Sequence, residues 1–216
     1  MGKSVHEGEK LAHYARACTD ITFAFPFGQQ ELMGIAARGD YDLRQHARES
    51  GKNLEYLDPV TNQKYLPHVI EPSIGVDRLF LALLTSAYTE ETPAGSNETR
   101  IVLKLHPAIA PIKVAVFPLV SNKADIVDKA RKIYQALLPR YTVEWDTSGA
   151  IGRRYRRADE SGIPFCITVD YDSLKDDTVT IRHRDSLKQE RLHLKELLPF
   201  LSTEIDGDSG ANSLLQ

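Results

Sequence analysis

The sequence predicts two differently built parts: an α+β first part with an antiparallel sheet and a long helix, and a second part that is an α/β three-layer domain. Strand patterns, a shorter helix and one long amphipathic helix occupy residues 1–107, whereas strands alternate with helices in residues 108–205. A connection rich in Pro and Gly, TEETPAGSNETR (89–100), precedes the second part. The small polar residues of 206–216 predict a disordered tail.

Composition and charge exclude several classes of protein. The chain has 216 residues, a net charge of -3 and 42% hydrophobic residues, so any surface for nucleic acid or membrane must be local. Cys18 and Cys166 form no CxxC pair, which argues against a zinc site or a disulfide framework and fits a reducing compartment. Without an apolar run of about 18 residues, we expect a cytoplasmic protein with no membrane partner.

The histidines also give no reason to expect a metal site. Six of them show no metal-ligand spacing: His13, His46, His68, His106, His183 and His193. We therefore expect structural or surface roles for them, and no metal.

The first part reads as three strands and two helices. DITFAFPF (20–27) alternates between polar and apolar residues, as a half-buried strand does. The stretch 28–50 begins as a strand and becomes helical near Asp42, and HVIEPSIG (68–75) is a strand that ends at a glycine turn. VDRLFLALLTSAYTE (76–90) has helical apolar spacing and predicts a long helix packed behind the sheet.

The second part alternates between strands and helices. The predicted strands are 112–120, 141–146, 164–170 and 178–185, and the predicted helices are 123–139, 152–162 and 186–201. The continuous apolar run IKVAVFPLV (112–120) is typical of a strand buried on both faces. Alternation of this kind predicts parallel strands with right-handed crossovers.

A charged cluster stands where the first long helix begins. Glu71 and Ser73 lie two residues apart on one strand, so their side chains share a face, and Gly75 allows close approach of a ligand. Arg78 in the first helical turn can pair with a carboxylate or phosphate and can stack on a flat ring. The alternative is a buried Glu71–Arg78 pair that only fixes the helix against the sheet.

The motif EPSIGVDRLFLALL (71–84) resembles motif 3 of class II aminoacyl-tRNA synthetases, specifically of the dimeric type of glycyl-tRNA synthetase. Two other regions resemble the same family, namely residues 11–51 and the stretches LHPAIAPIKVAVFPLV and SGAIGRRYRRADESGIPFCITVDYDSL of its anticodon-binding domain. The resemblance covers about residues 10–200 in the family's order and implies the C-terminal portion of such an enzyme. The first part would then belong to the class II antiparallel catalytic sheet with its motif 3 helix.

The resemblance implies roles for two sets of residues. Glycine would be bound by Glu71, Pro72, Ser73, Ile74 and Gly75, with Glu71 taking the amino group. ATP would be bound by Glu31, Leu32, Gly75, Val76, Asp77 and Arg78, with Arg78 against the adenine and toward the γ-phosphate. Gln29–Gln30 departs from the Trp-Gly that many members carry at this place.

The resemblance also implies ATP as a substrate, magnesium to neutralise phosphate charge, and tRNA(Gly) and glycine as partners. Motif 1, which builds much of the dimer interface, and motif 2, which supplies an arginine for the α-phosphate, are not found in the sequence. We therefore expect the chain alone to be inactive, and to need the N-terminal part of the synthetase or a homodimer partner.

A basic stretch predicts the RNA-binding surface. GRRYRRADESG (152–162) is the most positive local feature of the chain, and TIRHRDSLKQERLHL follows it. The candidates for anticodon contact are Arg153, Arg154, Arg156, Arg157, Arg182, Arg184 and Gln189. The alternative is a solvated helix paired with its own acidic residues, together with an arginine that braces the sheet.

Two other functions are alternatives to the synthetase that the resemblance implies. One is a non-catalytic relative, such as a free-standing RNA-binding module or a synthetase-like accessory subunit of a mitochondrial DNA polymerase. The presence of Glu71, Ser73, Asp77 and Arg78 argues against this, because a relic would be expected to lose the set. The other, a metabolic nucleotide-binding enzyme, lacks a Gly-rich phosphate loop.

Overall fold

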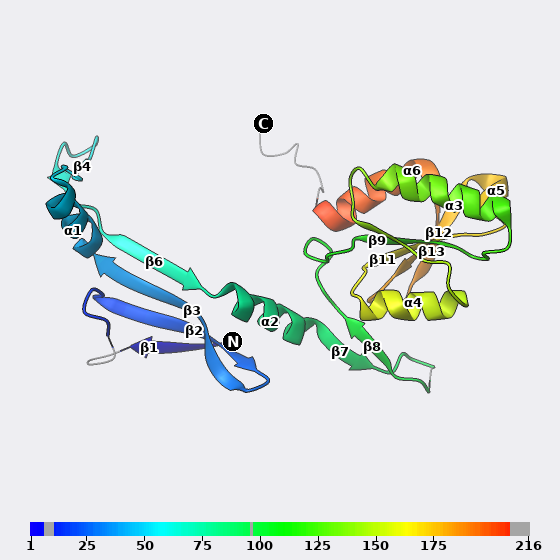
Figure 1. The fold of residues 1–216 in the computed structure, drawn as a ribbon, viewed down its shortest axis with the longest axis horizontal. Coiled ribbons are helices and arrows are strands. Elements are labelled where there is room, and N and C mark those ends of the chain that lie inside the picture. The colour runs from blue at the N-terminus through cyan, green and yellow to red at the C-terminus, as the bar shows by residue number, and fades with distance from the viewer. Residues whose placement is uncertain (7–10, 96, 208–216) are drawn as a thin grey trace. The chain divides into compact units, whose positions relative to one another are not determined.

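The fold was obtained as a computed structural model that describes residues 1–6, 11–95 and 97–207. The chain forms two compact units, Met1–Thr85 and Ser86–Gln216 (Figure 1). The units divide earlier in the chain than the expected boundary after residue 107, because a strand hairpin beyond Thr85 packs with the second unit. Residues 208–216 of the expected tail lie outside the described residues, whereas Asp206 ends a short π-helix.

The first unit is built on a four-stranded antiparallel sheet of order β1-β2-β3-β6. Its elements are β1 (Gly2–His6), β2 (Ala17–Phe25), β3 (Gly28–Gly39), α1 (Tyr41–Ser50), β4 (Tyr56–Leu57), β5 (Lys64–Tyr65), β6 (Val69–Ile74) and α2 (Val76–Ala87), the last of which continues into the second unit. The strands on both sides of the β2–β3 turn, the helix near Asp42 and the strand before Gly75 are as predicted.

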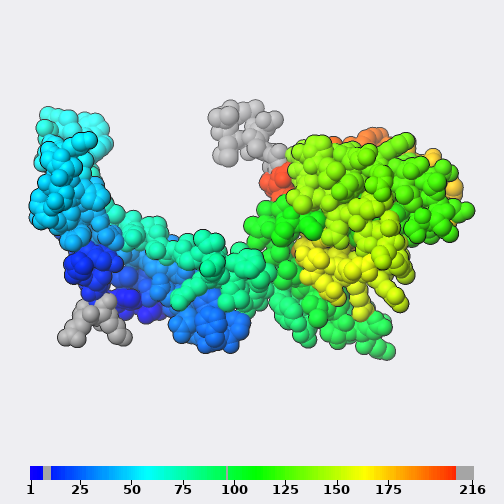
Figure 2. All heavy atoms as spheres, viewed as in Figure 1, coloured from blue at the N-terminus to red at the C-terminus, as the bar shows by residue number. Residues whose placement is uncertain are grey.

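Helix α2 differs from the prediction in two respects. It ends at Ala87, because Tyr88–Glu91 forms a strand, β7, that pairs with β8 (Arg100–Leu103); the expected irregular connection is therefore a hairpin. The helix was also expected to bury its apolar face behind the sheet. Instead Val76, Phe80 and Leu83 are exposed, Phe80 by 63%, and atoms of α2 form part of the visible surface (Figure 2). The apolar stripe exists, but the described sheet does not cover it.

The second unit is a three-layer sandwich around a five-stranded sheet of order β10-β9-β11-β12-β13. Its further elements are β9 (Val114–Pro118), α3 (Ala124–Leu137), β10 (Val143–Trp145), α4 (Ile151–Glu160), β11 (Phe165–Val169), α5 (Ser173–Asp176), β12 (Thr178–His183), β13 (Gln189–His193), α6 (Leu194–Leu201) and η2 (Ser202–Asp206). α3 and α6 pack on one face of the sheet, and α4 packs on the other.

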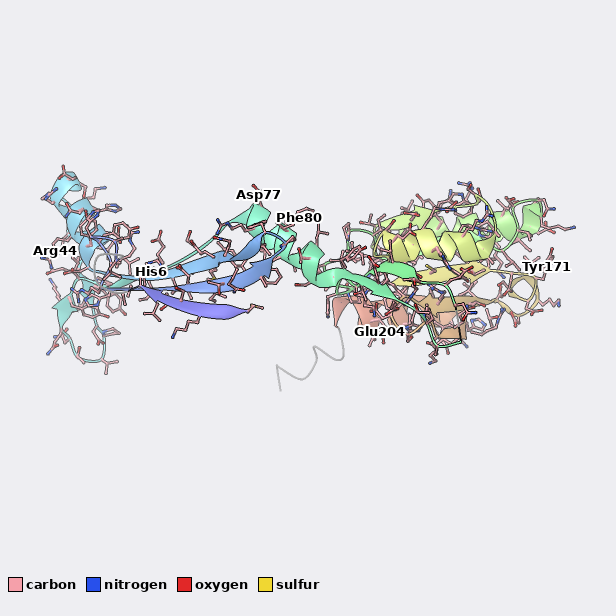
Figure 3. The ribbon with its side chains drawn as sticks, turned by 90° about the horizontal axis from the view of Figure 1, so that it is seen from below. His6, Arg44, Asp77, Phe80, Tyr171 and Glu204 are labelled. Atoms are coloured by element: carbon pink, nitrogen blue, oxygen red, sulfur yellow. The ribbon has the colours of Figure 1, made fainter. Side chains whose placement is uncertain are left out.

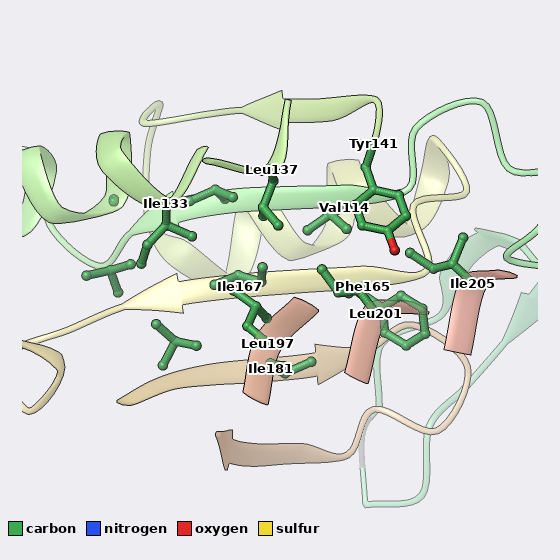
Figure 4. Packing of buried hydrophobic residues seen from close by; sticks show 14 of the residues in the cluster. Val114, Ile133, Leu137, Tyr141, Phe165, Ile167, Ile181, Leu197, Leu201 and Ile205 are labelled. Carbon is green, nitrogen blue, oxygen red and sulfur yellow. The ribbon is translucent and has the colours of Figure 1, made fainter. Parts of the chain in front are cut away.

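Strand β9 shows why this sheet needs helices on both sides. Val114 and Val116 face the core shared with α3 and α6, shown in Figure 4, whereas Ala115 and Phe117 face α4. All four side chains are fully buried, as the continuous apolar run predicts.

Two expectations for the second unit are wrong. The sheet is mixed rather than parallel: β9 pairs in parallel with β10 and β11, but β11–β12 and β12–β13 are antiparallel. The helix expected over 186–201 begins only at Leu194. Gln189–His193 is instead an edge strand, because Leu187 adopts a left-handed turn conformation (φ 61°) and reverses the chain onto β12.

Gly162 ends α4 as the sequence predicts. A substitution at this residue tests how tightly the C-terminal end of α4 is packed. Its φ is +77°, and an added Cβ would lie 3.0 Å from the carbonyl oxygen of Leu103. We expect Gly162→Ala to lower the free energy of unfolding by about 2 kcal/mol. Gly152→Ala, where an added Cβ meets open space, should leave it unchanged or raise it by up to about 1 kcal/mol. Denaturant titration followed by Trp145 fluorescence measures both, and equal effects would contradict the assigned contact.

Candidate functional site

The candidate glycine residues lie on β6, where pairing with β3 sets the direction of their side chains. Glu71 is opposite Ala36 and Ser73 is opposite Gly34. Directly opposed residues of an antiparallel pair lie on the same face of the sheet. Glu71 and Ser73 of β6 therefore lie on the same face as Gly34 of the neighbouring strand β3. This matches the alternation read from the sequence.

Glu71 is held by an arginine that the sequence analysis did not single out. Nη1 of Arg38 donates to Oε2 of Glu71 at 2.6 Å, and the same guanidinium donates from Nε and Nη2 to both oxygens of Asp42 at 2.7 Å. The guanidinium also lies 4.1 Å from the centre of the Tyr14 ring. Hydrogen bonds to Asp42, and then to Glu71, raise the pKa of Arg38 above its usual value. Arg38 is therefore a permanent cation that orients Glu71.

Glu71 remains accessible despite this pairing. Its side chain is 44% exposed, and its partner is Arg38 rather than Arg78. Arg78 is also exposed, and its Nη1 donates to the carbonyl oxygen of Glu31. The alternative of a buried Glu71–Arg78 pair is therefore wrong.

The candidate ATP residues come from two stretches. Gly75, Val76, Asp77 and Arg78 begin α2, where the amide of Leu79 donates to the carbonyl oxygen of Gly75 at 2.9 Å. Figure 3 labels Asp77 on the first turn of this helix. The hydrogen bond from Arg78 joins this helix start to Glu31 on β3.

Leu32 follows Glu31 at a β-bulge. Pairing with β2 shifts between Ile21 and Thr22: Ile21 is opposite Met33 and Thr22 is opposite Glu31, so Leu32 is the extra residue. A bulge of this kind re-aims neighbouring side chains. It turns Glu31 to the face of the sheet that carries Gly34.

Gly34 leaves room between two carboxylates. A Cβ added there would lie 3.4 Å from Oε1 of Glu31 and 3.7 Å from Oδ1 of Asp20. Asp20 was not among the candidates, although its place in the alternating strand 20–27 sets its face. Together Asp20, Glu31 and Glu71 make this an acidic face. Burial first, and then these three carboxylates, raise the pKa of the Cys18 thiol, as expected where negative charge gathers.

In the second unit, three of the candidate arginines are buried. Arg154 donates to the carbonyl oxygens of Pro118 (2.6 Å) and Leu119 (3.0 Å). Arg184 donates to those of Gly162 (2.9 Å) and Leu105 (2.7 Å). Arg154, Arg182 and Arg184 therefore fix the ends of strands and loops within the unit, as the bracing alternative anticipated for one arginine.

Arg182 belongs to a buried ionic network. It donates two hydrogen bonds of 2.8 Å to the carboxylate of Asp159, which also accepts one of 2.8 Å from Arg100 on β8. Arg100 further pairs with Glu91 of β7. The network attaches the β7–β8 hairpin to α4, which explains why the hairpin belongs to the second unit.

The remaining candidates are exposed. Arg153, Arg156 and Arg157 lie on α4, and Gln189 lies on the edge strand β13. Arg157 donates to Asp146 (3.0 Å from Nε) and to the carbonyl oxygen of Ser148 (2.7 Å). Arg153 and Arg156 line a shallow hollow of about 460 Å³ with Gly152 and Glu98, and Arg156 pairs with Glu98. Two of the three exposed arginines of α4 thus line this hollow.

The chain is similar to known proteins in both its family match and its full-length relatives. Residues 113–204 match the protein family described as "Anticodon binding domain". The chain is 52% identical over 200 residues to the glycine–tRNA ligase of Alkaliphilus oremlandii and 55% identical over 200 residues to that of Caldanaerobacter subterraneus. Each alignment covers 93% of this chain but only 42% of the relative.

A solved structure shows the same fold at lower sequence identity. The RNA binding domain of threonyl-tRNA synthetase from Cryptosporidium parvum superposes with a TM-score of 0.62 at 20% identity, covering 87% of this chain and 43% of that one. This likeness supports the fold. The ligase relatives and the anticodon-binding family, by contrast, confirm the resemblance to the C-terminal portion of a glycyl-tRNA synthetase. The chain is thus a homologue of glycine–tRNA ligases over a portion, less than half their length, that includes the anticodon-binding domain.

Proposed function

We propose that this chain is the part of a glycine–tRNA ligase that binds the anticodon of tRNA(Gly) with its second unit and supplies one side of the glycine and ATP site with its first. The observation that supports this most strongly is the register of β3 and β6. It brings Ser73 opposite Gly34 and sets Glu71 on the same face, while Arg78 reaches Glu31. Residues from two separate stretches of sequence thereby meet.

The acidic face suits a small zwitterion. Glycine offers an ammonium and a carboxylate, and a carboxylate such as Glu71 pairs with the ammonium while Ser73 donates or accepts a hydrogen bond. The missing side chain at Gly34, between Glu31 and Asp20, leaves space for a substrate without a Cβ. Glycine would then be selected by the negative charge of this face and by a space too small for a larger amino acid.

ATP would lie along the start of α2. Arg78 would stack against the adenine and reach the γ-phosphate, and Glu31 would face magnesium held by the phosphates. In the first step the glycine carboxylate attacks the α-phosphorus and pyrophosphate leaves. In the second, a ribose hydroxyl of tRNA attacks the glycyl carbonyl carbon of the adenylate, the ester forms and AMP leaves. These residues contribute positioning and electrostatic stabilisation.

Exposed apolar surface on α2 and on the sheet supports the proposal that a partner completes the catalytic domain. Val76, Phe80 and Leu83 are uncovered on α2, and the sheet has a shallow hollow of about 490 Å³ lined by Ile21, Ile35 and Ile70. Apolar faces of this kind mark interaction surfaces. The N-terminal part of the ligase, or a second copy, would cover them.

We expect the chain alone to give no ATP–pyrophosphate exchange with glycine. Addition of the remaining part of a glycine–tRNA ligase as a separate polypeptide should restore exchange. Phe80→Asp should weaken this complementation at least about tenfold, because it places a charge in the interface at a cost of several kcal/mol.

Lys52→Asp, on an exposed residue after α1, serves as the control and should complement like the unmodified chain. Exchange from the chain alone would show that this portion is catalytically self-sufficient and would overturn the expected dependence. Equal complementation by both variants would remove α2 from the interface.

The hollow beside α4 would receive the RNA. Arginines pair with phosphate and stack on unpaired bases, and Arg153 and Arg156 are exposed there. The buried Arg154, Arg182 and Arg184 are left out of this proposal, because their guanidiniums already bind backbone carbonyls or Asp159.

Replacing both Arg153 and Arg156 with Ala should weaken tRNA(Gly) binding about tenfold or more. It should also reduce the slope of log K against log salt by about one for each phosphate that the variant no longer binds. The control, Lys123→Ala with Lys132→Ala, removes the same charge from α3 and its N-cap, on the other face of the sheet. Fluorescence anisotropy at several salt concentrations measures both. An equal decrease in the control would indicate a non-specific charge effect.

A location in the cytoplasm remains a prediction. None of the helices in the described ranges is long and apolar enough to cross a bilayer.

A further inference from the structure

We propose that His6, Cys18 and Asp20 form a binding site for a divalent transition metal, with zinc as the best-matched ion, on the acidic face of the first unit. The ligand atoms of the three residues all lie within 4.8 Å of one another. This inference does not depend on the proposed ligase function, because it is tested by metal binding alone.

Strand pairing brings the three residues together. β1 and β2 are antiparallel with His6 opposite Cys18 and Ser4 opposite Asp20. Cys18 and Asp20 are two residues apart on β2, so they project to the same face as His6. Figure 3 labels His6, the last residue of β1. The site is thus mounted on two paired strands rather than on a loop.

The donor set is one that zinc prefers. Imidazole nitrogen, thiolate sulfur and carboxylate oxygen bind Zn²⁺ at about 2.0–2.3 Å, and three protein ligands with an open fourth position are a common arrangement. Ligand atoms around such an ion lie roughly 3–4 Å apart. Nε2 of His6 and Oδ2 of Asp20 are now 2.6 Å apart. A small side-chain rotation would therefore replace this hydrogen bond with two metal bonds, while the thiol proton leaves to solvent.

The surroundings also favour a cation. Glu31 and Glu71 contribute negative charge on the same face, and Gly34 adds no side chain over it. The positive charge of Arg38, which reaches this face through Glu71, is already paired with Asp42 and Glu71. The three ligands are all partly buried, so the ion would be shielded from part of the bulk water without being sealed off.

The spacing in the sequence hides this site. His6 is not close to either cysteine in a metal-binding pattern, and the two cysteines form no CxxC pair. Only the β1–β2 register makes the three residues neighbours. The proposal therefore departs from the expectation, drawn from spacing alone, that the chain has no metal site. An occupied site would also clamp β1 to β2 and stabilise the edge of the sheet.

Cobalt(II) is the probe for the test, because its bond to a thiolate gives an ultraviolet charge-transfer band. The full chain, stripped with a chelator, should bind one equivalent of Co²⁺ with this band, and Zn²⁺ should abolish it. Cys18→Ser should lose the band although Cys166 is still present, and His6→Ala and Asp20→Asn should weaken binding about 10- to 100-fold or more. His13→Ala, which changes an exposed histidine of the same unit, should bind like the unmodified chain.

A second measurement needs no variant of the ligands. Zn²⁺ should slow alkylation of Cys18 by iodoacetamide at least about tenfold in the unmodified chain, read by peptide mass spectrometry. A stripped chain without a thiolate–cobalt band, a band that persists in Cys18→Ser, or alkylation of Cys18 that zinc does not slow would each overturn the site and leave an ordinary His6–Asp20 ion pair.

Discussion

Asp159→Asn is expected to destabilise the second unit by about 3–5 kcal/mol, because it leaves two buried guanidiniums without their shared counter-charge. Asp159 is 1% exposed, and Arg100 and Arg182 are each 6% exposed. All three hydrogen bonds from these arginines to the carboxylate are 2.8 Å long. Urea or guanidinium titration followed by Trp145, the single tryptophan of the chain and part of β10, reports on this unit.

The matched control is Asp185→Asn. Asp185 also pairs with a buried arginine, Arg184, at 2.7 Å, but its own side chain is 56% exposed. Arg184 keeps the carbonyl oxygens of Gly162 and Leu105 as acceptors, so the loss of stability should stay near 1 kcal/mol or below. Equal losses at Asp159 and Asp185 would contradict the assignment of Asp159 as the centre of the network.

Glu71→Gln is expected to weaken binding of a non-hydrolysable glycyl-adenylate analogue about 10- to 100-fold. The substitution keeps the shape but removes the charge, and a hydrogen bond to a charged group contributes about 1.5–3 kcal/mol. It also leaves Arg38 with Asp42 as its remaining carboxylate. Isothermal titration of the ligase assembled from this chain and its missing part measures the affinity.

Glu49→Gln is the control for this change of charge. Glu49 is an exposed residue of α1 that pairs with Arg48, so its variant should bind the analogue normally. Normal binding by Glu71→Gln would show that Glu71 does not hold the ammonium group.

Local pattern predicted most strands and helices of the chain, but not what covers them. The apolar run of β9 requires burial on both sides, and this holds at Val114 and Phe117. The stripe on α2 is equally clear in the sequence, yet Phe80 is exposed. Periodicity defines an apolar face, whereas burial needs a partner surface that the described first unit does not provide.

Strand β13 shows a second limit. Gln189–His193 carries no β-branched residue and leads directly into a helical apolar pattern at Leu194, so propensity favours extending the helix backward. The strand forms because β12 offers an open edge and Leu187 turns the chain toward it. Tertiary pairing outweighs local preference here.

The candidate site was predictable where it depends on neighbours in sequence. Alternation alone places Glu71 and Ser73 on one face, and β6 does so. The role of Arg38 could not be predicted, because Arg38 reaches Glu71 only through the pairing of two strands. Buried and exposed arginines could not be separated either, since the carbonyl oxygens that hold Arg154 come from the distant end of β9 and the residue after it.

The most direct test of the account is binding of tRNA(Gly) to this chain, compared with the same tRNA carrying a changed anticodon, over a range of salt concentrations. We expect tighter binding of the unchanged tRNA, with a preference that survives as salt screens the phosphate contacts. Equal affinity for both tRNAs at every salt concentration would contradict an anticodon-reading role and reduce the second unit to a general basic surface.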